Sequence, residues 1–158
     1  MSSVSYNIRP IRQEDRAEFL ALSREFYASP AVLHPIADSY HKDAFTELMR
    51  SDVYLAAYLI CEGERIAGYA LLNKTYCREA GGPTVWIEEL YLRPSDQGKG
   101  AGRAFFRWLE ENIPAARYRL EVEPDNQRAA ALYRRMGYEA LPYLQMIRDN
   151  SAAGKQKP

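Results

Sequence analysis

Three glycines at alternating positions, Gly98, Gly100 and Gly102, constrain this chain more than any other feature of its sequence. They follow an apolar segment (84–92) that predicts a strand, and they open an amphipathic segment (98–112) that predicts a helix. Backbone N–H groups at a helix start point outward, and the helix dipole there favours an anion. Glycines also lack the Cβ atoms that would keep a phosphate at a distance. The junction therefore predicts an anion-binding site between a strand and a helix.

Standard phosphate-binding motifs do not describe this loop. A P-loop needs Gly-x-x-x-x-Gly-Lys followed by Ser or Thr, which the chain lacks. The dinucleotide fingerprint Gly-x-Gly-x-x-Gly fails because Arg103 stands at its last position when counted from Gly98. A glycine-rich turn without a ligand is the alternative. Three glycines at a helix start are costly in helix propensity, and a binding role would explain why the chain has them there. Lys99 and Arg103 add positive charge nearby.

Hydrophobic spacing along the chain predicts one sheet domain. Helices are expected at residues 13–27, 41–50, 98–112 and 126–136. Strands are expected at residues 5–11, 53–61, 65–77, 84–92 and 118–123, followed by a last strand or hairpin at 138–149. This order of elements predicts a mixed α/β, or α+β, sheet fold.

Length and charge limit the classes of protein that this chain can be. Its 158 residues suit a single domain, predicted at 1–149, followed by a polar tail at 150–158 that we expect to be disordered. Lys plus Arg and Asp plus Glu each number 21, and zero net charge argues against nucleic acid as a partner. The longest apolar run, 53–61, is too short to span a membrane, and no signal peptide is visible.

The two cysteines, Cys61 and Cys77, are predicted to be free thiols. A two-residue turn at Gly63 would place Cys61 opposite Ile66, with Cys77 far along the other strand and out of disulfide reach. Free thiols are typical of a reducing compartment, so we expect a cytoplasmic protein.

The glycine loop and its surroundings resemble the GNAT superfamily of N-acetyltransferases. Residues 97–102, Gln-Gly-Lys-Gly-Ala-Gly, match the family's acetyl-CoA signature Gln/Arg-x-x-Gly-x-Gly/Ala. The strand before them resembles the family's fourth strand, and Asn126, Tyr133 and Gly137 resemble its second conserved helix. The resemblance covers about residues 5–148 and implies the GNAT acyl-CoA acyltransferase fold. That fold is a central, mostly antiparallel, twisted sheet of about six or seven strands flanked by about four helices.

The resemblance also implies acetyl-CoA as the co-substrate. Loop backbone would hold the pyrophosphate, and the pantetheine arm would pair like an extra strand with the preceding strand, which a bulge opens. The residues expected at acetyl-CoA are Leu90, Tyr91, Leu92, Gln97, Gly98, Lys99, Gly100, Ala101, Gly102, Arg103, Asn126 and Ala129. Core packing is the alternative for the side chains of Leu90 and Leu92. No His, Cys and Asp cluster has metal-ligand spacing, so no metal is expected.

Asn126 and Tyr133 share one face of their predicted helix, because seven residues at about 100° each nearly complete two turns. The alternatives are a helix N-cap for Asn126 and a core aromatic for Tyr133. Acetyl transfer expels a thiolate, and a phenol of pKa about 10 can protonate that sulfur without being ionised itself at neutral pH. Tyr133 is therefore a candidate catalytic residue.

Two adjacent carboxylates, Glu88 and Glu89, interrupt an apolar strand. In a regular strand they point to opposite faces. The alternative to a catalytic role is that one carboxylate is solvated and the other forms a salt bridge with a basic residue. An ammonium must lose a proton before it attacks, and a carboxylate can hold the cation and relay the proton.

The segment that contains these carboxylates is similar to the diamine acetyltransferase branch of the family, in which Glu88 takes the substrate-binding position. Glu25 and Tyr27 resemble a Glu-Tyr pair of that branch and are further substrate-binding candidates, although Phe26 stands where that Tyr would be. His34 and His41 are expected to be surface or capping residues.

The sequence thus predicts direct transfer of an acetyl group from acetyl-CoA to a primary amine of a small cationic acceptor in a ternary complex. Two alternatives stay open: a catalytically silent acetyl-CoA-binding module that acts as a regulator or partner, and a protein lysine or N-terminal acetyltransferase. The prolines of the loop at 28–40 favour a covered pocket for a small acceptor. The family resemblance implies a homodimer.

Overall fold

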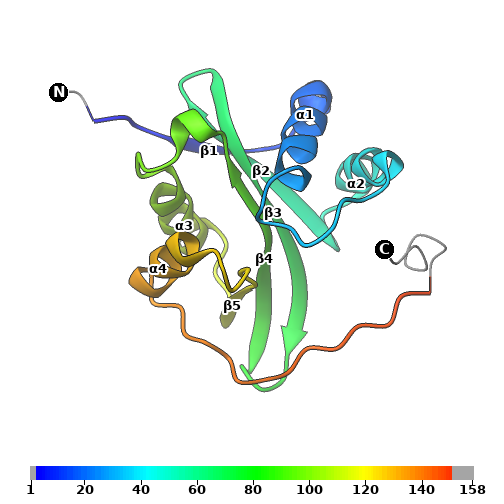
Figure 1. Cartoon of the computed structure of the whole chain (residues 1–158), viewed down its shortest axis with the longest axis vertical. Helices are drawn as coiled ribbons and strands as arrows, with labels where there is room; N and C mark the ends of the chain where they lie inside the picture. The colour runs from blue at the N-terminus through cyan, green and yellow to red at the C-terminus, as the bar shows by residue number, and fades with distance from the viewer. Residues whose placement is uncertain (1–2, 151–158) are drawn as a thin grey trace.

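The computed structural model describes residues 3–150, which form one five-stranded sheet with helices on both of its faces (Figure 1). The strands are β1 (Asn7–Pro10), β2 (Leu55–Glu62), β3 (Arg65–Cys77), β4 (Gly82–Leu92) and β5 (Arg117–Leu120). They lie in this order, and all neighbours are antiparallel except β4 and β5, which run parallel. The α-helices are α1 (Arg16–Tyr27), α2 (Asp38–Arg50), α3 (Ala101–Asn112) and α4 (Gln127–Arg135). Short 3-10 helices precede α1 and α3, namely η1 (Gln13–Asp15) and η2 (Pro94–Asp96).

The β2–β3 hairpin forms where the sequence predicts it. Gly63 takes the left-handed conformation, with φ +62°, that the tight turn requires. Cys61 pairs with Ile66, as expected, while Cys77 lies at the far end of β3. Both thiols are free, which confirms that prediction.

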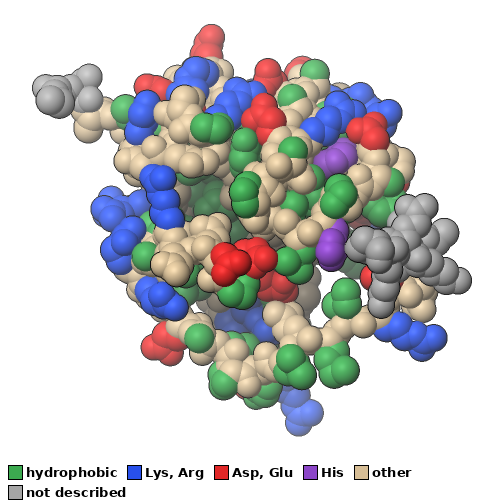
Figure 2. All heavy atoms as spheres, in the orientation of Figure 1, with side chains coloured by type: hydrophobic (Ala, Val, Ile, Leu, Met, Phe, Trp, Pro, Cys, Tyr) green, Lys and Arg blue, Asp and Glu red, His purple; other side chains and the backbone are tan. Residues whose placement is uncertain are grey.

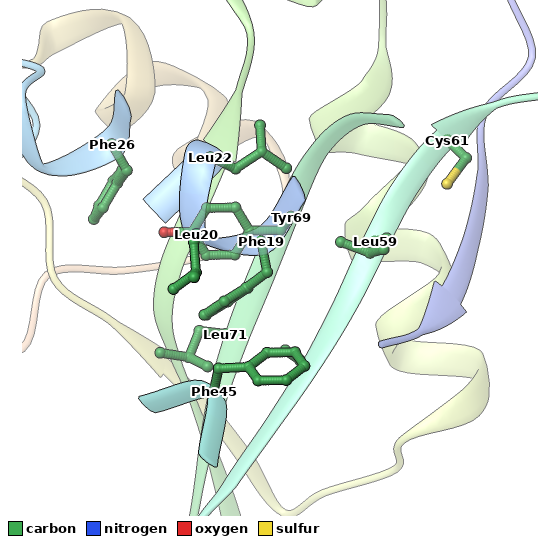
Figure 3. Close-up of a cluster of buried hydrophobic side chains, with 10 residues drawn as sticks. Phe19, Leu20, Leu22, Phe26, Phe45, Leu59, Cys61, Tyr69 and Leu71 are labelled. Atoms are coloured by element: carbon green, nitrogen blue, oxygen red, sulfur yellow. The ribbon is translucent and has the colours of Figure 1, made fainter. Parts of the chain in front are cut away.

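Alternating side chains give the sheet two apolar faces, and a pair of helices covers each face (Figure 1). On the α1 and α2 face, Phe19 meets Tyr69 edge to face with ring centroids 5.5 Å apart (Figure 3). On the other face, α3 buries Phe105 and Phe106 against the sheet. Tyr133 of α4 packs on Phe106 at 5.7 Å and stays partly exposed, so α4 lies against this core without being enclosed by it.

The prediction of six or seven strands was wrong, because the described residues form a sheet of five. Residues 138–149, predicted as a strand or hairpin, instead run as an irregular chain past the end of the β3–β4 hairpin (Figure 1). The edge strand β5 offers only four residues for pairing, and Pro142 lacks the N–H that a strand ladder needs. The hydroxyl of Tyr143 fastens the segment by donating to Glu79 Oε2 at 3.2 Å. Residues 151–158 of the predicted tail lie outside the described residues.

Candidate active site

The glycine loop joins η2 to α3 and presents an open helix start. Gly98 and Gly100 have φ of +75° and +89°, a region that residues with a Cβ rarely adopt. Gly100 is the N-cap residue of α3, and no side chain within residues 3–150 caps the helix there. The backbone N–H of Ala104 bonds to the Gly100 carbonyl oxygen at 3.0 Å, so the N–H groups at positions 101–103 precede the first helical bond. This helix start can hold an anionic group, as the sequence predicts.

A buried carboxylate fixes the loop to the sheet. Asp96 is 0% exposed and accepts two hydrogen bonds from Arg65, at 2.9 and 2.6 Å, and one from the Tyr6 hydroxyl at 3.2 Å. The Arg65 guanidinium holds the pKa of Asp96 down at about 2, so the pair stays ionised near neutral pH. Sequence reasoning missed this anchor, because its partners lie 31 and 90 positions away along the chain.

Strand β4 separates from β5 where the cleft begins. The β4–β5 ladder runs from Thr84 to Ile87, whereas β4 continues to Leu92 and, of the described strands, pairs there with β3 alone. The backbone of 88–92 therefore leaves its β5-side edge open to an extended ligand. A bulge lies at the same place, since Leu71 pairs with Glu89 and Leu72 with Ile87. The opened strand that the family resemblance implies is thus present.

A cleft of about 800 Å³ lies between this open strand edge, the glycine loop and α4. Phe26, Ser29, Pro30 and Ala31 line it from α1 and the loop that follows that helix. The predicted residues that line it are Leu90, Tyr91, Leu92, Gln97, Gly98, Gly100, Ala101, Gly102, Arg103, Asn126, Ala129 and Tyr133. Lys99, Glu25, Tyr27, Glu88 and Glu89 are not part of its wall. The side chains of Leu90 and Leu92 also pack on the α3 core, which confirms the alternative expected for them.

Arg128 and Arg135 of α4 line the same cleft, and sequence reasoning missed both. Arg128 lies close enough to the loop that a Cβ at Gly98 would stand 2.7 Å from its Nη2 atom. The available sequence signal for Arg128 was its place in the first turn of a helix, where the dipole disfavours a basic residue; Arg135 lies in the last turn and gave no such signal. With Arg103, these side chains give the cleft three guanidinium groups that suit an anionic ligand.

Asn126 and Tyr133 lie on the cleft face of α4. The Asn126 side chain accepts a hydrogen bond from the Ala129 N–H at 3.2 Å, so its expected N-cap role is confirmed. The Tyr133 ring packs on Phe106, and burial raises the pKa of its phenol, which keeps the group protonated at neutral pH. Among the described residues, no protein group hydrogen-bonds to the Tyr133 hydroxyl.

Glu88 and Glu89 do not point to opposite faces of the sheet, as a regular strand predicts, because the bulge places both carboxylates on the α1 face. Glu89 accepts a hydrogen bond from the hydroxyl of Tyr69, which packs beneath α1, at 3.1 Å. Glu88 accepts one from Asn73 Nδ2 at 2.8 Å. Asn73 lies two positions after Leu71, which belongs to the α1 core, so its side chain projects from that same face. The pair is therefore not divided between the two faces, as a regular strand would require.

The two carboxylates differ in their access to water. Glu89 is 7% exposed, and burial raises the pKa of its carboxyl to about 7 despite the Tyr69 hydrogen bond, which lowers it. Glu88 is exposed at its surface, although partial desolvation and the nearby charge of Glu121 still raise its pKa. Burial, together with the charges of Glu89 and Glu88, raises the pKa of Tyr27 to about 12. Neither carboxylate forms a salt bridge with a described residue, so the predicted alternative of a salt-bridged partner is not met.

Glu25 and His41 border this acidic region from the α1 side. Glu25 accepts a hydrogen bond from the Tyr91 hydroxyl at 3.1 Å, which connects it to a residue of the cleft wall. His41 is buried, contrary to its expected surface position, and its Nδ1 lies 2.6 Å from Ser23 Oγ. Burial lowers the pKa of His41, while His34 is exposed as expected.

Within residues 3–150, no group of three or more His, Cys, Asp or Glu side chains could hold a metal ion. The same part of the chain contains no helix that is long and apolar enough to cross a membrane.

Comparison with known proteins identifies the family. The model of the Acetyltransferase (GNAT) family matches residues 16–138, which include the cleft, the glycine loop and α4. The chain belongs to the GNAT family of acetyltransferases. Thialysine N-epsilon-acetyltransferase of Mus musculus is 24% identical to this GNAT protein over 148 residues, covering 87% of this chain and 86% of its own. The Bos taurus enzyme of that name is 27% identical over 128 residues, covering 79% and 73%.

Solved structures show that the fold is shared as well. The aminoglycoside N-acetyltransferase AAC(6')-Iy in complex with CoA superposes with a TM-score of 0.72 and 18% identity, over 93% of this chain and 96% of that one. This GNAT protein is accordingly an acetyl-CoA-dependent N-acetyltransferase. Its cleft fits that co-substrate, because an open helix start, three guanidinium groups and a free strand edge line one space.

Proposed function

We propose that this enzyme transfers the acetyl group of acetyl-CoA directly to a primary amine of a small cationic acceptor, with both substrates bound together. The observation that carries the proposal is the carboxylate pair Glu88 and Glu89 at the bulge. They directly precede Leu90, where the cleft wall begins along β4. An ammonium group that approaches the thioester from the α1 side therefore meets negative charge first.

Charge around the site supports a cationic acceptor. The charge of Glu121 helps to raise the pKa of Glu88, so a third carboxylate borders the pair. Figure 2 shows acidic side chains beside a hollow near the middle of the face it presents. Such a surface attracts an amine and repels an acid. The mammalian relatives are named for an acceptor of this kind, thialysine, which gives the proposal independent support.

Glu89 and Tyr133 divide the proton transfers in the proposed reaction. The amine must lose a proton to become a nucleophile, and a carboxyl of pKa about 7 can accept it, through water, near neutral pH. Nitrogen then attacks the thioester carbonyl carbon, and the carbon–sulfur bond breaks as the amide forms. The Tyr133 phenol, protonated and free of other protein partners among the described residues, can give its proton to the departing sulfur. The second proton of the nitrogen, released as the amide forms, then restores the phenol through water.

The loop and α4 hold the co-substrate in this proposal. Open N–H groups at positions 101–103 bind the pyrophosphate, and Arg103 and Arg128 add charge-assisted contacts to phosphate oxygens. The free edge of residues 88–92 pairs with the amides of the pantetheine arm. Glu25 and Tyr27 border the acceptor. Two free thiols support a cytoplasmic location, and the exposed Leu144, Met146 and Ile147 support a homodimer.

A panel of acceptors tests the proposal. Purified enzyme with acetyl-CoA is given diamines, lysine analogues, an aminoglycoside, neutral alcohols and a lysine-containing peptide. CoA thiol release and the mass of the acetylated product are both measured. Diamines or lysine analogues should give the highest kcat/KM. Preference for the peptide would replace the proposed acceptor class, and CoA binding without any product would indicate a silent module.

A further inference from the structure

Cys77 lies at the end of β3 that is remote from the glycine loop, and several hydrogen-bond donors converge on its sulfur. The backbone N–H of Ala80 donates to Cys77 Sγ at 3.4 Å across the turn that joins β3 to β4. From β5, the Arg117 guanidinium reaches the same sulfur, with Nη1 at 3.9 Å. A neutral thiol is a weak acceptor, whereas a thiolate uses such donors fully. The arrangement is therefore suited to a negatively charged sulfur.

Thr84 supplies an independent observation at the same place. Its side chain is 1% exposed, and its buried hydroxyl has no hydrogen-bond partner among the described residues. Thr84 pairs across the β3–β4 ladder with Thr75, two residues before Cys77, so its side chain projects from the same face of the hairpin as the Cys77 sulfur. A buried, unpartnered hydroxyl is costly, and an ionised sulfur on the same face of the hairpin would offer it an acceptor.

The charges around Cys77 favour its ionised form. Arg78 and Glu79 adjoin it in the turn, Arg117 faces it from β5, and Tyr143 reaches the turn from the C-terminal segment. The carboxylate of Glu79 pairs with Arg117 at 3.5 Å and accepts from the Tyr143 hydroxyl, which reduces its repulsion of the sulfur. Hydrogen bonds from the turn backbone are the largest cause that lowers the pKa of Cys77.

The other cysteine is a natural internal control. Cys61 is 2% exposed within the α1 core, whereas Cys77 is only half-buried. Burial raises the pKa of the Cys61 thiol. One thiol of the chain is thus inert by environment, and the other is accessible and surrounded by donors.

We propose that Cys77 is a modification site, a reactive thiol that forms a mixed disulfide with a low-molecular-weight disulfide such as glutathione disulfide. The Cys77 thiolate attacks one sulfur of the disulfide, a new sulfur–sulfur bond forms, and the other half leaves as a thiolate that takes a proton from water. The disulfide is the oxidant, and a free thiol in excess reverses the step.

The test follows this chemistry on the intact, folded enzyme. The reduced protein is incubated with glutathione disulfide at pH 7, and the modified cysteine is identified by mass spectrometry of its peptides. Alkylation by iodoacetamide is followed as a function of pH for each cysteine. We expect Cys77 to react at least ~10-fold faster than Cys61, with its alkylation midpoint at lower pH than in the urea-unfolded chain.

Two variants test whether the reactivity of Cys77 depends on the hydrogen-bond donors at its sulfur or only on its exposure. Arg117→Gln should slow the Cys77 reaction about two- to fivefold at pH 7 and move its midpoint to higher pH. Arg119→Gln is the matched control, since Arg119 lies on the same strand and stacks on Trp86 at 4.1 Å instead. Equal reactivity of the two cysteines overturns the proposal. So does a Cys77 midpoint equal to that of the unfolded chain, or an Arg117→Gln variant that matches Arg119→Gln.

Discussion

Replacing Glu89 by Gln should stabilise the fold at neutral and alkaline pH while it removes the proposed proton acceptor. The carboxyl is 7% exposed, and burial raises its pKa from the ordinary 4.5 to about 7. A raised carboxyl pKa means that the folded state binds the proton more tightly than the unfolded state does. Wild-type stability therefore falls as pH rises from about 4.5 towards 7 and is level above that range.

The size of this cost follows from the same pKa. At about 1.4 kcal/mol per pH unit, ionising the buried carboxyl above pH 7 lowers the unfolding free energy by about 3 kcal/mol. Gln cannot ionise and still accepts the hydrogen bond that the Tyr69 hydroxyl makes at 3.1 Å. The stability advantage of Glu89→Gln over wild type should thus grow by about 2 to 3 kcal/mol between pH 5 and pH 8.

Urea unfolding, followed by circular dichroism at pH 5, 6, 7 and 8, measures this difference. Glu111→Gln is the control, because it makes the same chemical change at an exposed carboxylate on α3 and so shows what the substitution does without burial. A Glu89→Gln advantage that does not change with pH would refute the reasoning, since a purely steric effect has no reason to depend on pH.

Three further predictions concern the co-substrate cleft. Tyr133→Phe should lower kcat by about 10²- to 10⁴-fold with little change in CoA affinity measured by calorimetry; an unchanged kcat under rate-limiting chemistry would leave Tyr133 as a core aromatic. Gly100→Asp should abolish CoA binding, whereas Gly100→Ala, which carries the same backbone strain at φ +89° without the charge, should retain part of it; equal losses would reject a charge effect. Asp96→Asn should raise the KM for acetyl-CoA and destabilise the fold by about 2 kcal/mol at pH 7, a loss that shrinks as pH falls towards 2; an unchanged KM would make Asp96 purely structural.

Local sequence patterns were enough for the glycine loop and the helices around it. The glycine turn, the helix that follows it and the N-cap at Asn126 depend on a few neighbouring residues, so spacing predicts them, although α3 begins at Ala101 and not at the expected Gly98. The β2–β3 hairpin is equally local, because its turn and register follow from Gly63.

Features that depend on contacts between distant segments were not predictable. The bulge that turns Glu88 and Glu89 to one face arises from the pairing of β4 with β3, and neither strand reveals it alone. The anchor of Asp96 on Arg65 joins segments that are 31 positions apart. The prediction of a last strand at 138–149 was wrong for a similar reason, since apolar composition predicts strand formation but does not supply a neighbouring strand to pair with.

The most direct test of the acceptor proposal is a comparison of KM values for wild type and Glu88→Gln. Gln keeps the shape of the side chain and can still accept the Asn73 hydrogen bond of 2.8 Å, so the change removes charge alone. With a diamine acceptor, measured where its amines are protonated, the KM should rise about tenfold with kcat little changed, whereas an uncharged amine acceptor should show a much smaller rise. Equal KM values for every cationic acceptor in Glu88→Gln, with the increase appearing in Glu89→Gln instead, would assign acceptor binding to Glu89. Unchanged KM values in both variants would contradict a cationic acceptor at this carboxylate pair.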